Sequence, residues 1–243
     1  VANSLPQKKT DFTYLIRRNK KRKRVSIHVL PPGIVEIRIP SFLSDKEAIE
    51  LAKNKKSWIQ SRIQEIKESP YFLPPQTFSH GDFFLFRGEK VQLSLIKGRN
   101  SVSLTKGKLE VTVPPGLSGI AQKEYIRKSV VSFYHSQAQS LLRNKTISFS
   151  ESINRKPVFI TVKEYASRWG CCFCDGRIVY NWRIIMAPDD VIDYVIVHEL
   201  CHLEEPNHSA RFWENVEKII PDWQRRRAWL KDNGHALTIT PSF

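Results

Sequence analysis

The pattern His198-Glu199-Leu200-Cys201-His202 constrains the fold more strongly than any other feature of this 243-residue sequence. Residues four apart lie on one face of an α-helix, so both imidazoles can reach a common ion if this segment is helical. Glu199 then lies about 100° round the helix axis from His198. Pro188 and the aspartates after it favour a helix start, and Pro206 favours an end, which predicts a helix over residues 189–203.

His208 is the candidate third ligand of that ion, because Pro206-Asn207 supplies a break at which the chain can fold back. Three nitrogen ligands leave the fourth position of a tetrahedral zinc ion open to water, as in catalytic sites. The spacing is typical of zinc metallohydrolases, and it predicts one zinc ion with Glu199 as general acid and base. Two alternatives stay open: a carboxylate ligand, Glu214 or Glu217, in place of His208, and a surface helix whose two histidines bind no metal.

Basic residues are concentrated in the first two thirds of the chain. The sequence has 39 Lys and Arg against 24 Asp and Glu, a net charge of +15. Residues 1–70 carry 16 basic and 7 acidic side chains, whereas residues 151–243 carry 12 and 13. This asymmetry indicates a region that attracts polyanions, joined to a nearly neutral region. Solubility and a basic strand edge that resists aggregation explain it equally well.

A run of cations before the first expected hairpin is the candidate nucleic-acid contact. Such a contact would neutralise phosphates without reading base sequence, and it would weaken steeply as salt rises. A solvated entry to a strand is the alternative. The cations are Arg17, Arg18, Lys20, Lys21, Arg22, Lys23 and Arg24.

Apolar runs and cysteines bear on the cellular compartment. No stretch approaches the roughly 20 apolar residues that a membrane span needs, and residues 1–11 are polar. Cys171, Cys172 and Cys174 are too closely spaced for a disulfide framework. We therefore expect no membrane contact and a cytoplasmic location. We expect the cysteines, Cys201 included, to be small packed residues rather than a second metal or redox site.

Alternating apolar and polar residues predict two similar hairpins within 25–40 and 102–113, each followed by a helical segment. The first helical segment would begin after an N-cap at Ser44 and run to residue 68, and the second would run from 119 to about 143. Together they suggest a β-rich region of repeated hairpin-helix units. A further hairpin is expected at 81–98, and the prolines between 70 and 75 mark a boundary.

The pattern changes at residue 157. Strands are predicted at 158–163 and 177–185 with an Asp175-Gly176 turn between them, and helices at 209–220 and 221–233 follow the histidine-bearing helix. The sequence thus predicts an α+β protein with three regions. They are a basic N-terminal hairpin-helix region, 1–75, a second hairpin-helix region, 76–156, and the catalytic core, 157–243.

Several segments carry a resemblance to a known family: 167–172 (SRWGCC), 176–183 (GRIVYNWR), 192–202 (IDYVIVHELCH), Asn207-His208, Phe212-Trp213, the strand Val35 to Pro40 and Trp58-Ile59. From about residue 15 to 240 the sequence resembles the YgjP-like metallopeptidases, relatives of the SprT/Spartan zincins. The resemblance implies a zincin-like α+β catalytic domain, with His198, His202 and His208 as zinc ligands and Glu199 as general acid/base. The family's Gly-Ser-Cys is Gly170-Cys171-Cys172 here, which leaves the metal site intact.

Further candidates concern the substrate and the orientation of the ligands. The strand 177–183 is a candidate for holding a substrate backbone by strand addition, with Asn181 facing the cleft. Asp193 and backbone carbonyls are candidates for orienting the imidazoles through their second nitrogen.

The expected function is a zinc peptidase with a peptide or protein as substrate. One alternative is a metal-dependent hydrolase of nucleotide phosphoanhydrides, since zinc and basic side chains also suit phosphoryl chemistry. The other is a protease of nucleic-acid-bound proteins, by analogy with Spartan.

Overall fold

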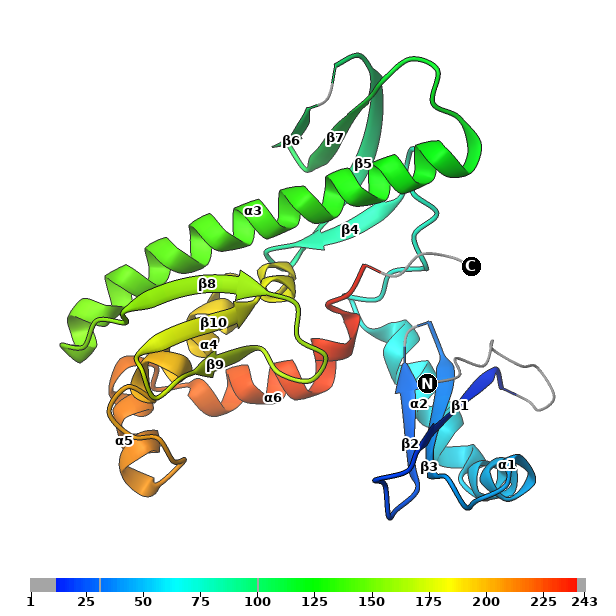
Figure 1. Ribbon diagram of the computed structural model, residues 1–243, viewed down its shortest axis with the longest axis horizontal. Coiled ribbons are helices and arrows are strands. Elements are labelled where there is room, and N and C mark those ends of the chain that lie inside the picture. The colour runs from blue at the N-terminus through cyan, green and yellow to red at the C-terminus, as the bar shows by residue number, and fades with distance from the viewer. Residues whose placement is uncertain (1–11, 31, 100, 240–243) are drawn as a thin grey trace. The chain divides into compact units, whose positions relative to one another are not determined.

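The proline-containing stretch near residue 75 separates two compact units, Val1–Pro74 and Pro75–Phe243, in a computed structural model of the chain (Figure 1). The structure describes residues 12–30, 32–99 and 101–239. Each unit is built round its own sheets and helices. Within the described ranges, no helix combines the length and the apolar character that crossing a membrane requires.

The first unit contains a three-stranded sheet covered by two helices. Strands β2 (Ser26–Leu30) and β3 (Ile34–Pro40) form the expected antiparallel hairpin. Strand β1 (Tyr14–Asn19), which the sequence analysis did not foresee, pairs with β3 in parallel, so the sheet order is β1-β3-β2. Helices α1 (Asp45–Lys53) and α2 (Lys56–Glu68) follow. Ser44 caps α1 in a capping box with Glu47, as expected for its position.

The second unit begins with a four-stranded sheet in the order β4-β5-β7-β6. Both hairpins predicted in this part of the sequence are present, but β5 and β7 pair in parallel between them. One 35-residue helix follows this sheet, whereas two short helices follow the sheet of the first unit, so the repeated hairpin-helix unit stays a prediction. The strands are β4 (Phe83–Phe86), β5 (Glu89–Lys97), β6 (Val102–Thr105) and β7 (Lys108–Val113).

A second sheet of the same unit has the order β8-β10-β9, with β8 (Phe159–Lys163) and β9 (Gly170–Cys172) on either side of β10 (Arg177–Asn181). The Asp175-Gly176 turn joins β9 to β10, and β8 pairs with β10 in parallel. The prediction that the strand continues to residue 185 was wrong. It ends at Asn181, whose side chain accepts the Arg183 N–H and starts a 3₁₀ helix, η1 (Trp182–Met186).

Helix α3 (Gly119–Ile153) connects the two sheets (Figure 1). It extends ten residues beyond the expected end near 143, because its last turns bury polar residues that carry no apolar signal. Thr146 and Ser150 are buried, and their hydroxyls donate to carbonyls of the same helix. Along α3, side chains bond in turn to both sheets and to the histidine-bearing helix: Tyr125 to Thr112, Tyr134 to Leu85, Gln139 to Ile160, Lys145 to Asp193, and Thr146 to Tyr180.

The edge of β8 is closed by a side chain of α3. The Gln139 amide donates to the Ile160 carbonyl at 3.3 Å and accepts the Val162 N–H at 3.1 Å. These bonds replace those of a neighbouring strand and block the pairing that an open edge invites. The sheet therefore offers its other edge, β9, for pairing.

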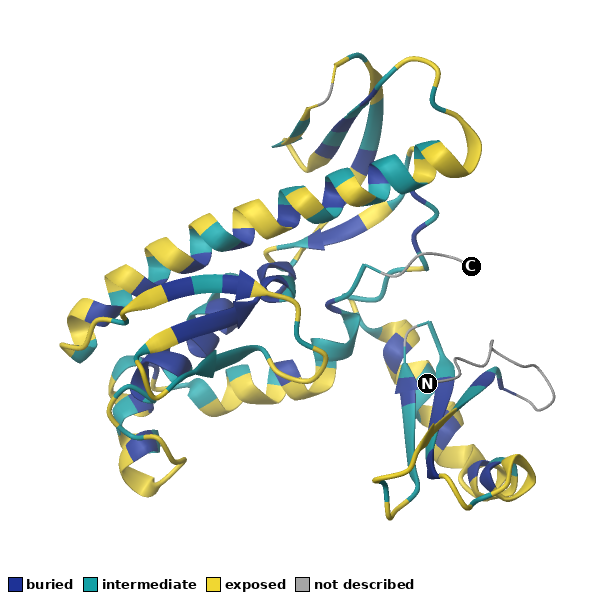
Figure 2. Cartoon of the chain, viewed as in Figure 1, coloured by how far each residue is buried: buried dark blue, intermediate teal, exposed yellow. Residues whose placement is uncertain are grey.

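Helix α4 (Asp189–Cys201) carries the histidine pattern and lies in the core of the second unit, as the dark blue of Figure 2 shows for it and for β10. Its last residue falls two short of the expected 203, and His202 is the C-cap. The chain then continues through α5 (Ala210–Ile219), α6 (Trp223–Asn233) and a 3₁₀ turn, η2 (Gly234–Ala236).

Replacement of the edge-closing amide should weaken the second unit. Gln139→Met keeps the side-chain length but leaves the Val162 N–H unpaired, so the free energy of unfolding should fall by about 1–2 kcal/mol. Urea denaturation followed by circular dichroism measures this. Gln137→Met, on an exposed position of the same helix, is the matched control. Equal stability of the two variants would contradict the role given to Gln139.

Candidate metal centre

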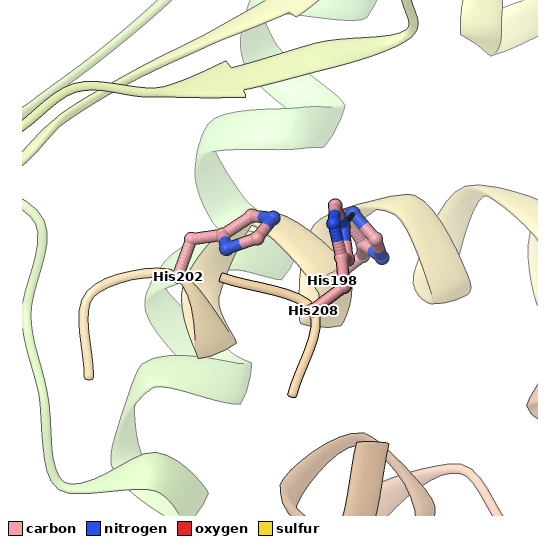
Figure 3. Close-up of side chains that lie close together, drawn as sticks. All are labelled: His198, His202 and His208. Carbon is pink, nitrogen blue, oxygen red and sulfur yellow. Dashed lines mark hydrogen bonds between the residues drawn. The ribbon is translucent and has the colours of Figure 1, made fainter. Parts of the chain in front are cut away.

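Three histidine side chains converge at the end of α4 (Figure 3). The ligand nitrogens of His198, His202 and His208 all lie within 4.8 Å of one another. The Nε2 atoms of His198 and His208 are 3.0 Å apart. The structure thus brings together the three residues that the sequence analysis singled out as ligands.

The chain reversal that returns His208 is built from local hydrogen bonds. The N–H groups of Leu203, Glu204 and Glu205 donate to carbonyls in the last turn of α4, which closes the helix at His202. Pro206 cannot continue it. Ser209 then caps α5 by accepting the Phe212 N–H, so His208 stands immediately before a new helix. The break expected at Pro206-Asn207 therefore lies where the third imidazole needs it.

The second nitrogen of each imidazole decides which nitrogen is free for a metal. His202 Nδ1 lies 2.9 Å from the Glu205 carbonyl oxygen, which can only accept, so Nδ1 donates and Nε2 is left free. Asp193, the expected orienting residue, instead pairs with Lys145 of α3 at 2.6 Å. His198 Nδ1 is buried and has no hydrogen-bond partner among the described residues.

Aromatic rings pack against the histidines, of which His198 and His202 are half-buried and His208 is exposed. The Phe212 ring lies 5.0 Å from that of His198 and 4.5 Å from that of His202, and Trp213 stacks on His208. Burial, together with smaller effects of the neighbouring His202 and His208, lowers the pKa of His198 to about 3. Burial also lowers the pKa of His208. Both imidazoles are therefore neutral at physiological pH, the form that binds a metal.

Glu199 lies beside the histidines, packed against strand β9. A Cβ atom on Gly170 would lie 2.6 Å from Glu199 Cδ, so the glutamate occupies space that only a glycine leaves open. Glu199 is 6% exposed, and burial raises its pKa to about 7 against the opposing effects of the Cys172 backbone N–H and the Arg168 charge. A cavity of about 380 Å³ is bordered by Glu199, by all three histidines and by β9.

The donor set fits a zinc ion. Two nitrogen ligands of tetrahedral zinc, with bonds of about 2.0–2.1 Å, lie about 3.3 Å apart, which is close to the observed separation of the two Nε2 atoms. Within the described part of the chain, these histidines are the one group of three or more potential metal ligands, and Glu214 and Glu217 are exposed and outside it. Burial raises the pKa of Cys172 to about 11 and that of Cys201 to about 12, which disfavours thiolate ligands.

The structure does not place the expected substrate contacts at the histidines. Asn181 is buried, donates to the carbonyls of Tyr165 and Arg168, and accepts the Arg183 N–H, so it holds the loop before β9 instead of facing a cleft. Strand β10 cannot add a substrate strand either, because β8 and β9 occupy both of its edges.

The cations of the basic run lie in the first unit and differ in their contacts. Arg17 pairs with the buried Glu36, and Arg18 pairs with Asp45 at 2.9 Å. Arg22 donates to the Ser26 hydroxyl. The other four side chains are exposed, and none forms an ion pair within the part of the chain that the structure describes: Lys20, Lys21, Lys23 and Arg24.

Two groups of the site, Gly170 and the Glu205 carbonyl, were not predicted from the sequence. Gly170 matters through its lack of a side chain, and the role follows only once β9 is known to lie against α4. The Glu205 carbonyl belongs to the backbone, so its residue type gives no indication of its role. Its position between two histidines and before Pro206 is the sequence signal that could have indicated it.

Comparison with known proteins agrees with the site. A model of the YgjP-like metallopeptidase domain matches residues 23–233, so the chain belongs to the YgjP-like metallopeptidase family. Membership makes it a metallopeptidase, with a peptide or protein as substrate, and implies a divalent metal, for which zinc is typical.

The other two comparisons add little. No curated protein matches the chain. Among solved structures, it is similar to the metallopeptidase zymogen of Pyrococcus abyssi abylysin, with 19% sequence identity over 37% of this chain and 93% of that chain, and a TM-score of 0.34. A likeness this low adds nothing to the family assignment.

Removal of one imidazole should abolish metal loading. His202→Ala leaves two nitrogens, so the bound zinc measured by plasma mass spectrometry after dialysis should fall from one ion per chain to nearly none. His135→Ala, at an exposed position of α3, should keep full loading. Retention of zinc by His202→Ala would show that the ion binds elsewhere.

Proposed function

We propose that the chain is a zinc-dependent peptidase that holds one ion through His198, His202 and His208 and uses Glu199 as general acid and base. The observation that carries this is the buried Glu199 side chain beside three converging imidazoles. The ion, when bound, would lower the pKa of water toward 7 and polarise the carbonyl of the cleaved bond. With only three protein ligands, the ion would keep a position free for the oxygen of the water or of the carbonyl.

Glu199 would move the protons of the reaction. Its carboxylate would accept a proton from the attacking water and deliver it to the nitrogen of the departing amine, as the C–N bond breaks. The Cys172 N–H holds the carboxylate on the side of β9, and the Gly170 backbone leaves it space.

Strand β9 would hold the substrate backbone. It pairs with β10 on one side, and its other edge pairs with no strand among the described residues. Gly170 and Cys172 of β9 also border the cavity that contains the histidines. An extended peptide added to this edge would lie over Glu199 and the metal ligands.

Loss of the carboxylate should abolish hydrolysis without loss of the metal. Glu199→Gln keeps the size of the side chain but cannot accept a proton, so kcat should fall by about 10²–10⁴-fold at unchanged zinc content. A panel of peptides and ATP, assayed with the metal-stripped protein and with Glu214→Gln as the exposed-glutamate control, tests this. Hydrolysis of ATP in the absence of any peptide cleavage would support phosphoanhydride hydrolysis instead.

A second activity, non-specific nucleic-acid binding, is favoured by the four exposed cations between β1 and β2, which form no ion pair with any residue that the structure describes. If these cations contact phosphates, affinity for a DNA duplex should fall roughly 100-fold between 50 and 200 mM salt. Replacement of Lys20, Lys21, Lys23 and Arg24 by Gln should reduce that salt dependence. Replacement of Lys90, Lys97, Lys108 and Lys123 of the second unit is the charge-matched control, and an equal effect of both sets would exclude a specific role for the run.

A further inference from the structure

A second cavity, of about 350 Å³, lies beside Glu199 and is strongly basic. Like the first cavity, it is bordered by Arg168, Gly170, His198 and Glu199, so both open onto the same carboxylate. Three cations line the second cavity, and Glu199 is the one acidic residue among the described residues that line it. The cations are Arg168, Arg227 and Lys231.

None of these cations forms an ion pair in the described part of the chain, although the Arg168 charge acts on Glu199. Arg225 and Arg226, which precede Arg227 on α6, both pair with Asp222. Arg227 instead lies over the Trp213 ring, 5.2 Å from its centroid. The three side chains are exposed, so an anion in this cavity could pair with them without displacing an existing ion pair.

The three cations come from two segments that the fold brings together. Arg227 and Lys231 are four residues apart on α6 and so lie on one face of that helix. Arg168 comes from the loop before β9, where its backbone carbonyl accepts a hydrogen bond from the Asn181 amide. Tyr194 and Leu230 complete the wall between them. The cavity thus joins α6 to the edge of β9 next to the proposed catalytic carboxylate.

The direction of strand β9 indicates which part of a bound peptide would reach the second cavity. An antiparallel partner, the more stable pairing, would run from Cys172 toward Gly170. Phe173 and Cys174 border only the first cavity, and Trp169 borders only the second. The part of the substrate that follows the cleaved bond would therefore reach the basic cavity.

We propose that this cavity binds a carboxylate of the substrate on the C-terminal side of the cleaved bond and so selects acidic peptides. The carboxylate belongs either to an acidic side chain or to the peptide's own C-terminus. The proposal rests on the proposed peptidase function. Arg168, Arg227 and Lys231 are its specificity-determining residues.

Matched peptides separate the two sources of the carboxylate. The peptides carry Glu or Gln after the cleaved bond, each with a free or an amidated C-terminus, and kcat/KM is measured on the zinc-loaded protein. We expect at least a tenfold preference for the carboxylate-bearing member of one pair. A preference within the Glu and Gln pair assigns the site to a side chain, and a preference for the free terminus assigns it to the C-terminus.

Charge variants test the residues. In Arg227→Gln/Lys231→Gln the ratio of the two kcat/KM values should fall to about one, and Arg227→Glu should shift the preference toward a Lys peptide. Lys123→Gln/Lys128→Gln, exposed on α3, should keep the wild-type ratio. Zinc content and circular dichroism report whether each variant is folded. Peptides cleaved at equal rates whatever their charge would overturn the subsite and leave the peptidase function standing.

A binding measurement tests the carboxylate-binding cavity independently of the proposed peptidase function. Calorimetry of the Glu199→Gln protein with the same peptides should show tighter binding of the carboxylate-bearing member. If no peptide is cleaved by the zinc-loaded wild type, the proposed function fails, and this titration still decides about the cavity. Selective binding that is lost in Arg227→Gln/Lys231→Gln would support it, and equal binding of all peptides would overturn it.

Discussion

The close contact between Glu199 of α4 and Gly170 of β9 is the constraint on which the site depends. A side chain at residue 170 would push the helix and the edge strand apart, because the interior has no room to absorb the added volume. With glycine there, the carboxylate lies between the histidines on its own helix and the exposed edge of the sheet. One contact therefore fixes the distance between the proposed proton carrier and the proposed substrate strand.

The electrostatic environment differs between the two sides of Glu199. On one side, burial keeps the His198 imidazole neutral and able to bind a cation. On the other, Arg227 and Lys231 present positive charge that no described carboxylate neutralises. A bound metal ion would add to that positive charge, so an anionic substrate group would be favoured most strongly in the loaded protein.

The parts of the fold that were predictable from sequence are those with a local cause. The spacing of His198 and His202 favours a helix, Pro206 limits how far that helix can extend, and alternation predicts the hairpins. The end of α3 and the parallel pairs β1–β3, β5–β7 and β8–β10 were missed, because they depend on non-local contacts and on buried hydroxyls. Asn181 and Asp193 were misplaced for the same reason: their partners, Tyr165 and Lys145, are more than ten residues away.

X-ray absorption spectroscopy of the zinc-loaded protein tests the central claim most directly, because it reports the ligand atoms of the ion. Three converging imidazoles predict only nitrogen and oxygen neighbours at about 2.0–2.1 Å, with the multiple-scattering signal of histidine rings. Sulfur neighbours at about 2.3 Å would place the ion on the cysteines near β9 and contradict the account.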